Sequence, residues 1–280
     1  MNLKEIEEKI LSGGRISREE ALWLEGNVDT DTLCDAADRL RRRFHSDDVD
    51  SCSIVNARSG NCGEDCKWCA QSSRHATGCE TYNFLDEEEV MTAAKRNEHE
   101  GIHRFSLVTS GRAVSRKDLE KFCEIYRHLS SETNLYLCAS MGLLDAERMK
   151  MLAKAGVKRY RCNMETCAEH FRTLCTSHTP EDKRATIRAA REAGLDVCSG
   201  GIIGMGESMK QRIDFAFELA DLDVDSVPIN ILNPIPGTPL EKTAPLSEDE
   251  IIRTSVSFFR ARPFALPEAG KASPMLPLCG

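Results

Sequence analysis

The strongest constraint on the fold is a regular alternation of short apolar segments with helical segments after residue 52. A single direction of strand–helix alternation produces a parallel sheet, and six such units indicate an α/β fold of the (β/α) TIM-barrel type, either partial or complete. The length of 280 residues allows one domain of barrel size. The predicted strands are 53–57, 103–109, 135–140, 159–164, 196–203 and 226–232, and the intervening helices lie near 86–100, 115–129, 145–155, 180–193 and 209–221.

Both flanks of this region differ from it. Residues 1–48 have helical periodicity, with Ser17 as the expected N-cap of one helix and another helix at 31–44, so they predict an N-terminal helical cap. Residues 49–260 form the predicted barrel. The tail 261–280 holds four prolines and little strand pattern, which is compatible with a barrel that is incomplete at its C-terminus.

Composition excludes several classes of function. The chain has 37 basic and 45 acidic residues, a net charge of −8, and no basic run interleaved with aromatics, so we expect no nucleic-acid partner. We find no run of about 18 apolar residues and expect no membrane span. Thirteen cysteines without an export signal predict reduced thiols in the cytoplasm, available as metal ligands.

The spacing Cys-x3-Cys-x2-Cys at Cys62, Cys66 and Cys69 is the most informative motif. Three thiolates can hold three irons of a [4Fe-4S] cluster, which leaves the fourth iron open to a small molecule. Zinc sites usually pair two Cys-x2-Cys units, and a redox dithiol needs only one. Neither of these patterns is completed in the same segment, so the spacing favours the cluster.

Four blocks extend this motif: residues 66–74 (CKWCAQSSR), 160–166 (YRCNMET), 197–207 (VCSGGIIGMGE) and 227–239 (VPINILNPIPGTP). In this order and spacing, the region 51–241 resembles the biotin synthase family of the radical S-adenosylmethionine (SAM) superfamily. The resemblance implies that the [4Fe-4S] cluster binds SAM and that a 5'-deoxyadenosyl radical abstracts hydrogens from dethiobiotin. An auxiliary iron–sulfur cluster then donates sulfur to form biotin. The resemblance also implies a homodimer and an electron donor such as flavodoxin or ferredoxin.

The resemblance assigns binding roles to individual residues. Trp68 is expected beside the adenine of SAM, although a half-buried tryptophan that steadies a loop is the alternative. Ile202 is also expected near adenine, and Glu165 is expected to accept hydrogen bonds from the ribose. Asn163 and Asn230 are expected to bind the ureido group, which an amide suits because it offers both a donor and an acceptor. Either asparagine alone would more often be a strand-end turn residue.

Strand alternation gives an independent expectation for the fourth strand. Arg161, Asn163 and Glu165 should share one face, and Cys162 and Met164 should share the other. Cys162 could reach the first face only through a bulge.

The auxiliary cluster is where the chain departs from the family pattern. The resemblance implies that Cys138 and Cys198 are ligands, but Ser106 stands where another cysteine is expected, and the block that carries an arginine ligand is not recognisable. A different cysteine set, with Cys162 and Cys175 as candidates, would then build a [2Fe-2S] cluster or a variant of higher nuclearity. Four further cysteines of the barrel and cap are interpreted as small apolar fillers: Cys34, Cys52, Cys79 and Cys123.

Two other functions stay open at this point. The chain could be a radical SAM enzyme that acts on another substrate, similar to a hydrogenase-cofactor maturase, or a truncated, non-catalytic chain that binds iron and sulfide. The pair Asn163 and Asn230 favours a substrate that carries a urea group.

Overall fold

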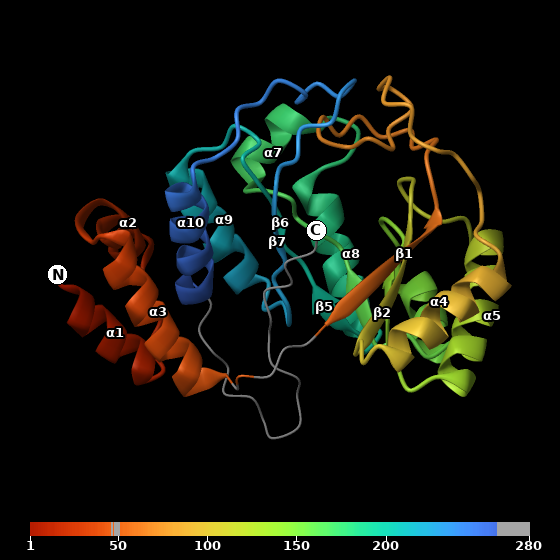
Figure 1. Ribbon diagram of the computed structural model, residues 1–280, viewed down its shortest axis with the longest axis horizontal. Coiled ribbons are helices and arrows are strands. Elements are labelled where there is room, and N and C mark those ends of the chain that lie inside the picture. Colours follow the sequence, from red (N-terminus) through yellow and green to blue (C-terminus); the bar gives the residue numbers. More distant parts are fainter. Residues whose placement is uncertain (46, 48–50, 262–280) are drawn as a thin grey trace.

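The computed structural model describes residues 1–45, 47 and 51–261. Helices and parallel strands alternate along the chain after three N-terminal helices (Figure 1). The helices are α1 (Leu3–Leu11), α2 (Arg18–Asn27), α3 (Thr30–Phe44), α4 (Glu87–His99), α5 (Arg116–Glu132), α6 (Ala146–Lys154), α7 (Ala168–Leu174), α8 (Pro180–Glu192), α9 (Met209–Asp221) and α10 (Glu248–Ala261). The strands are β1 (Cys52–Arg58), β2 (Arg104–Thr109), β3 (Tyr136–Ser140), β4 (Arg159–Arg161), β5 (Asp196–Cys198), β6 (Gly201–Ile203) and β7 (Ile229–Ile231).

The strands follow the chain order around a curved parallel sheet. β1 to β5 form one ladder in sequence order, and β6 pairs with β7. The predicted strand 196–203 is interrupted at Ser199 and Gly200, but the Ser199 N–H still donates to the Ser226 carbonyl oxygen at 2.9 Å. The strand–helix alternation therefore gave the correct α/β barrel architecture. Within the described ranges, no ladder joins β7 to β1.

The sheet has two faces of different chemistry. Register places Ser106 beside Cys138, Cys138 beside Arg159, and Arg161 beside Cys198. Register partners in a parallel sheet point to the same side, and residues two apart share that side. We call this side the lumen face; its members on the first five strands include Cys52, Ile54, Asn56, Arg104, Ser106, Tyr136, Cys138, Arg159, Arg161, Asp196 and Cys198.

The opposite side packs against the helices and forms the core. Leu107, Leu137, Tyr160 and Val197 alternate with the lumen residues, and each is 2% exposed or less. Because this side is apolar and the lumen face is polar, the pattern resembles a barrel whose outer layer of helices covers the hydrophobic side. The polar lumen face is thus available for a site.

The N-terminal helices lie beside the barrel: α2 packs against α9 and α10, α3 packs against α10, and α1 packs against α3 (Figure 1). Ser17 caps α2 through a capping box with Glu20, as its sequence position predicted. The Arg253 guanidinium on α10 donates from Nε to Glu25 at 2.9 Å. The domain boundaries at 48/49 and 260/261 stay predictions, and residues 262–280 of the predicted tail lie outside the described residues.

None of the helices in the described ranges is both long enough and apolar enough to span a membrane.

Candidate active site

The candidate site lies at the carboxyl ends of the strands, where the sequence placed its motifs. A long loop, residues 59–83, follows β1 and carries the Cys-x3-Cys-x2-Cys motif; we call it the cysteine loop. In Figure 1 it lies at the same end of the barrel as the connection from β6 to α9 and the segment after β7. Active sites of (β/α) barrels occupy this end.

Backbone hydrogen bonds fold the cysteine loop back on itself. The Cys62 N–H donates to the Gln71 carbonyl oxygen at 3.0 Å, and the Ser73 N–H donates to the Cys62 carbonyl oxygen at 2.8 Å. The Cys69 N–H donates to the Cys66 carbonyl oxygen at 3.1 Å, which closes a tight turn between those two cysteines. The three cysteines are therefore gathered in one compact loop.

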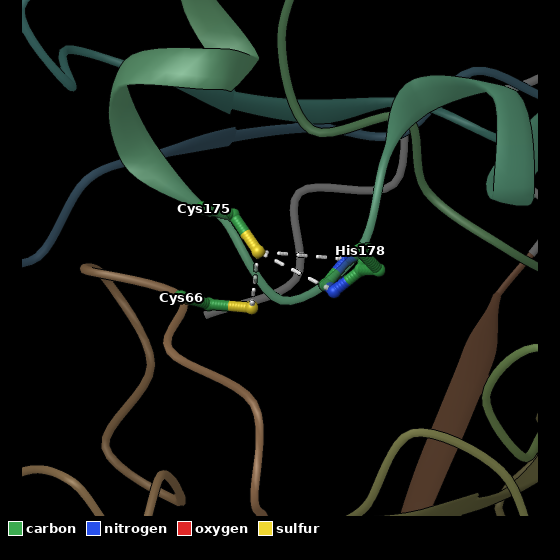
Figure 2. Close-up of side chains that lie close together, drawn as sticks. All are labelled: Cys66, Cys175 and His178. Carbon is green, nitrogen blue, oxygen red and sulfur yellow. Dashed lines mark hydrogen bonds between the residues drawn. The ribbon is translucent and has the colours of Figure 1, made fainter.

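The loop is fixed to the segment after α7 by sulfur contacts. The Cys66 and Cys175 sulfurs lie 3.7 Å apart, and Cys175 Sγ lies 3.3 Å from His178 Nδ1 (Figure 2). His178 in turn contacts the Glu64 carboxylate. The structure thus corrects the placement of Cys175: it was a candidate for the auxiliary cluster, but it contacts the cysteine loop.

Asp65 makes the same connection through oxygen. Its carboxylate accepts hydrogen bonds from the Thr176 N–H at 2.9 Å and the Ser177 N–H at 3.0 Å. Partial burial raises the pKa of Asp65, but the donors of Thr176 and Ser177 outweigh it and hold this pKa well below its usual range. An ionised Asp65 therefore ties the cysteine loop to the residues that follow α7.

Three closely spaced thiols are the donor set that an iron–sulfur cluster requires, although without metal two of them keep their protons. Burial raises the pKa of Cys69, and the neighbouring Cys62 and Glu165 raise it further. The contact between Cys66 and Cys175 raises the pKa of Cys66 far above its usual value and lowers the pKa of Cys175 to about 4, which His178 also lowers. Thiolates of Cys62, Cys66 and Cys69 can be stabilised by iron, which replaces their protons. The residues present fit a [4Fe-4S] cluster held by these three cysteines.

Trp68 packs against α7, and its ring lies 6.1 Å from the Phe171 ring in an edge-on arrangement. Lys183 on α8 reaches the same region: its ammonium lies 5.6 Å from the Phe171 ring and donates to the Asn163 carbonyl oxygen at 2.8 Å. Lys183 is only 7% exposed. No sequence pattern pointed to this lysine, because a lysine on an amphipathic helix is typically exposed to solvent.

The predicted alternation on the fourth strand holds as far as Asn163. Arg161 Nε donates to Asn163 Oδ1 at 3.4 Å, so these two side chains share a face. Glu165 has a φ of +73°, and its carboxylate lies 4.0 Å from the Lys183 ammonium. This left-handed backbone ends the regular alternation and directs Glu165 toward the cysteine loop. Its negative charge there raises the pKa of Cys69.

The two asparagines, Asn163 and Asn230, lie on either side of the backbone at residues 200–201, where β5 leads into β6. The Gly200 N–H donates to Asn163 Oδ1 at 3.3 Å, and Asn230 Nδ2 donates to the Gly201 carbonyl oxygen at 3.4 Å. Both bonds are long, so each amide keeps capacity for another partner. A Cβ at Gly200 would lie 1.8 Å from the Pro228 carbonyl oxygen, so the glycine allows the adjacent strands to approach closely.

Ile202 lies beside Asn230 in register on β6. The turn after β6 is held by a buried carboxylate that the sequence reasoning missed. Glu207 accepts from the N–H groups of Gly204 and Met205, both at 2.7 Å, and from Arg212 Nε at 2.7 Å. An acidic residue directly after a glycine-rich turn was the available signal. Glu207 fixes the backbone at the end of the strand that carries Ile202.

A second cysteine site lies deeper on the lumen face. Cys138 is 4% exposed on β3, and Cys198 is half-buried on β5. Arg159 is 4% exposed; its Nη2 lies 3.4 Å from Asp196, but its Nε and Nη1 have no hydrogen-bond partner among the described residues. The Ser106 hydroxyl is buried and also lacks such a partner within these ranges. Buried donors without acceptors indicate space for an anionic group, which an iron–sulfur cluster with thiolate ligands supplies.

Cys162 does not face this space. It alternates with Arg161 on β4, is 8% exposed, and belongs to the hydrophobic core between sheet and helices. No bulge turns it inward: the Cys162 N–H donates to the Cys198 carbonyl oxygen at 3.0 Å, as regular pairing requires. The structure therefore corrects the expectation that Cys162 is a candidate ligand of the auxiliary cluster.

Comparison with known proteins gives a consistent result. Residues 57–219 match the Radical SAM superfamily. The biotin synthase of Porphyromonas gingivalis is 51% identical over 258 residues, which cover 92% of this chain and 78% of that protein. The biotin synthase of Desulfotalea psychrophila is 52% identical over 267 residues, which cover 94% of this chain and 80% of that protein.

Solved structures share the fold at much lower identity. Methylornithine synthase (PylB) superposes with a TM-score of 0.79 at 22% identity, covering 92% of this chain and 77% of that one. The FeFe-hydrogenase maturase HydG from Carboxydothermus hydrogenoformans gives a TM-score of 0.76 at 19% identity, covering 92% of this chain and 63% of that one. These likenesses support the barrel architecture alone.

The cysteine loop, the polar lumen and half-identical relatives along nearly the whole chain lead to one conclusion: the chain belongs to the biotin synthase family of the radical SAM superfamily.

Proposed function

We propose that this chain converts dethiobiotin to biotin in the lumen of the barrel, with the SAM cluster and the auxiliary cluster on opposite sides of the substrate. One observation carries this arrangement. Along the fourth strand, Arg159 pairs with Cys138, Arg161 pairs with Cys198, and Asn163 and Glu165 follow toward the cysteine loop. At about 3.3 Å per residue, the Cys138 level lies roughly 13 Å below Asn163.

The first site belongs to SAM. We assign Cys62, Cys66 and Cys69 as ligands of the [4Fe-4S] cluster that binds it. Glu165 is the proposed acceptor for the ribose hydroxyls, and its half-buried position beside Lys183 supports a fixed carboxylate. When bound, the [4Fe-4S] cluster would supply the electron that cleaves SAM to a hydrogen-abstracting radical, and the auxiliary cluster would supply the inserted sulfur.

Trp68 and Ile202 are proposed to contact the adenine. Trp68 is held by Phe171 at one edge, so it can offer an apolar surface without reordering. Asn163 is proposed to contact both SAM and the substrate.

The substrate is held between the two sites. We propose that Asn163 and Asn230 bind the ureido ring, because both amides flank Gly200 and Gly201 and retain hydrogen-bonding capacity. Lys183 positions Asn163 through its backbone oxygen. Fixing the ring from two strands would orient the carbon chain of the substrate along the lumen axis.

The sulfur source is assigned to the auxiliary iron–sulfur cluster near Cys138 and Cys198. Arg159 and Arg104 lie beside these cysteines and provide positive charge. A flavodoxin or ferredoxin as electron donor, a homodimeric state and a cytoplasmic location are further parts of the proposal. The thiol-rich site is consistent with a reducing compartment.

The proposed function is tested by iron and sulfide analysis of anaerobically prepared protein, followed by product identification. We expect iron for two clusters, reductive SAM cleavage and biotin from dethiobiotin. SAM cleavage without biotin formation would indicate another substrate. Absence of both clusters after reconstitution would indicate a non-catalytic chain, and either result would refute the proposal.

A further inference from the structure

Cys52, at the start of β1, lies on the lumen face. It pairs in register with Arg104, while Ser106, two residues further along β2, pairs with Cys138. This location on the lumen face contradicts the interpretation of Cys52 as an apolar filler of the core. Cys123 is part of the hydrophobic core and Cys34 packs against it, whereas Cys52 is half-buried on the polar side of the sheet.

The Cys52 thiol also faces the same space as two other thiols. In register, Cys52 is level with Tyr136, two residues before Cys138, and Cys138 is level with Asp196, two residues before Cys198. Alternate strands of a (β/α) barrel contribute inward-facing residues to the same layer of the lumen. Three strands, β1, β3 and β5, therefore direct cysteines into one part of the lumen.

Two buried polar residues near these thiols have atoms without a hydrogen-bond partner among the described residues. Arg159 is 4% exposed and Ser106 is 3% exposed, yet Arg159 Nε and Nη1 and the Ser106 hydroxyl form no hydrogen bond there. A buried guanidinium with two donors unsatisfied is costly in free energy. Cluster sulfides and thiolate sulfurs accept such donors, so these atoms point to a ligand rather than to packing.

Other candidates for a third cysteine are placed elsewhere. Cys162 lies in the core, and Cys175 contacts Cys66. Ser106 would bind iron only as an alkoxide, which is much harder to form than a thiolate with its reference pKa near 8.5.

We propose that Cys52 is the third cysteine ligand of the auxiliary cluster, together with Cys138 and Cys198, and that Arg159 donates its unpartnered N–H groups to the cluster sulfurs. This inference rests on the proposed function, since it presumes that an auxiliary cluster is bound at this site. It assigns to β1 a ligand that the sequence pattern led us to expect on β2.

The test compares three variants after anaerobic reconstitution with ⁵⁷Fe: Cys52→Ala, Cys138→Ala and Ser106→Ala. Iron and sulfide counts with Mössbauer spectra separate auxiliary iron from the SAM cluster. We expect Cys52→Ala and Cys138→Ala to lose the auxiliary iron while reductive SAM cleavage persists. Ser106→Ala, a neighbouring lumen residue, is the matched control and should keep the auxiliary iron.

The outcomes distinguish the inference from the proposed function. Auxiliary iron retained in Cys52→Ala but lost in Cys138→Ala would overturn the role of Cys52 alone. Auxiliary iron retained in both variants would overturn the auxiliary site itself, and the inference with it. Loss of the auxiliary iron in Ser106→Ala as well would also contradict the assignment, because the serine would then be needed.

A measurement on the unmodified chain guards against misfolding of a variant. The loaded protein and the chelator-stripped protein are alkylated with N-ethylmaleimide and analysed by peptide mass spectrometry. We expect Cys52, Cys138 and Cys198 to be protected only in the loaded protein, and Cys34, which packs against the core, to react equally in both. Equal labelling of Cys52 in both preparations would overturn the proposal.

Discussion

Replacement of Glu207 by Gln should destabilise the loop that follows β6. The carboxylate is 5% exposed and accepts three hydrogen bonds of 2.7 Å, from the N–H groups of Gly204 and Met205 and from Arg212 Nε. Gln has the same shape but replaces one acceptor oxygen by an NH2 group. The new NH2 group would then face a donor, either a backbone N–H of Gly204 or Met205 or the Arg212 guanidinium. The positive charge of Arg212 would also lose its closest negative partner.

The structure limits the size of the effect. Removing one partner of a buried ion pair costs about 3–5 kcal/mol. Arg212 is 3% exposed, but its Nη1 keeps a longer contact of 3.5 Å with the half-exposed Glu250. We therefore expect the lower end, about 3 kcal/mol, which corresponds to a fall in Tm of roughly 6–12 °C at about 2–4 °C per kcal/mol.

The assay is thermal unfolding of the anaerobically prepared protein, followed by circular dichroism, with SAM affinity measured in parallel. Lys210→Met is the control, because Lys210 lies on α9, the helix that carries Arg212, and pairs with Asp214 on its surface. It should leave Tm unchanged within error, whereas Glu207→Gln should lower both Tm and SAM affinity. A Tm within about 1 °C of the parent, or strictly additive effects of Glu207→Gln and Arg212→Met, would refute the argument.

Three further predictions concern the cysteine loop and the substrate. Cys66→Ala should abolish reductive SAM cleavage, because the cluster would lose one of its three ligands; release of 5'-deoxyadenosine at the parent rate would contradict this. Asn230→Leu should weaken dethiobiotin binding by about one to two orders of magnitude, since an unpaired polar contact costs about 1–3 kcal/mol. Titration calorimetry should show little change in SAM affinity without substrate, and an equal loss of both affinities would indicate a structural role. In the cluster-free chain, diamide should link Cys66 to Cys175, because their sulfurs are 3.7 Å apart and need only a short approach to bond. Peptide mapping that finds both thiols intact, while other cysteines are oxidised, would show that the contact is not maintained in solution.

The sequence alone predicted the architecture and supplied the ligands that we propose for the first metal site. Strand and helix periods are local properties, so most element positions were predicted within a few residues, and Ser17 was identified as a cap from its neighbours. The cysteine motif was also readable because Cys62, Cys66 and Cys69 lie within eight residues of one another, so their spacing alone suggested the ligand set that we propose. The face of Asn163 on the fourth strand followed from the two-residue period of a strand.

Only the tertiary structure decided which distant residues share a site. Cys175 approaches Cys66 across more than a hundred residues, Lys183 reaches Asn163 from α8, and Cys52 joins the lumen face through the register of β1 on β2. Chain-order periodicity gives the face of a residue within its own element but contains no information on how neighbouring elements are aligned. The proposed SAM-cluster ligands therefore follow from local spacing, whereas the surroundings of the proposed auxiliary site depend on strand register, which the packing of the whole barrel sets.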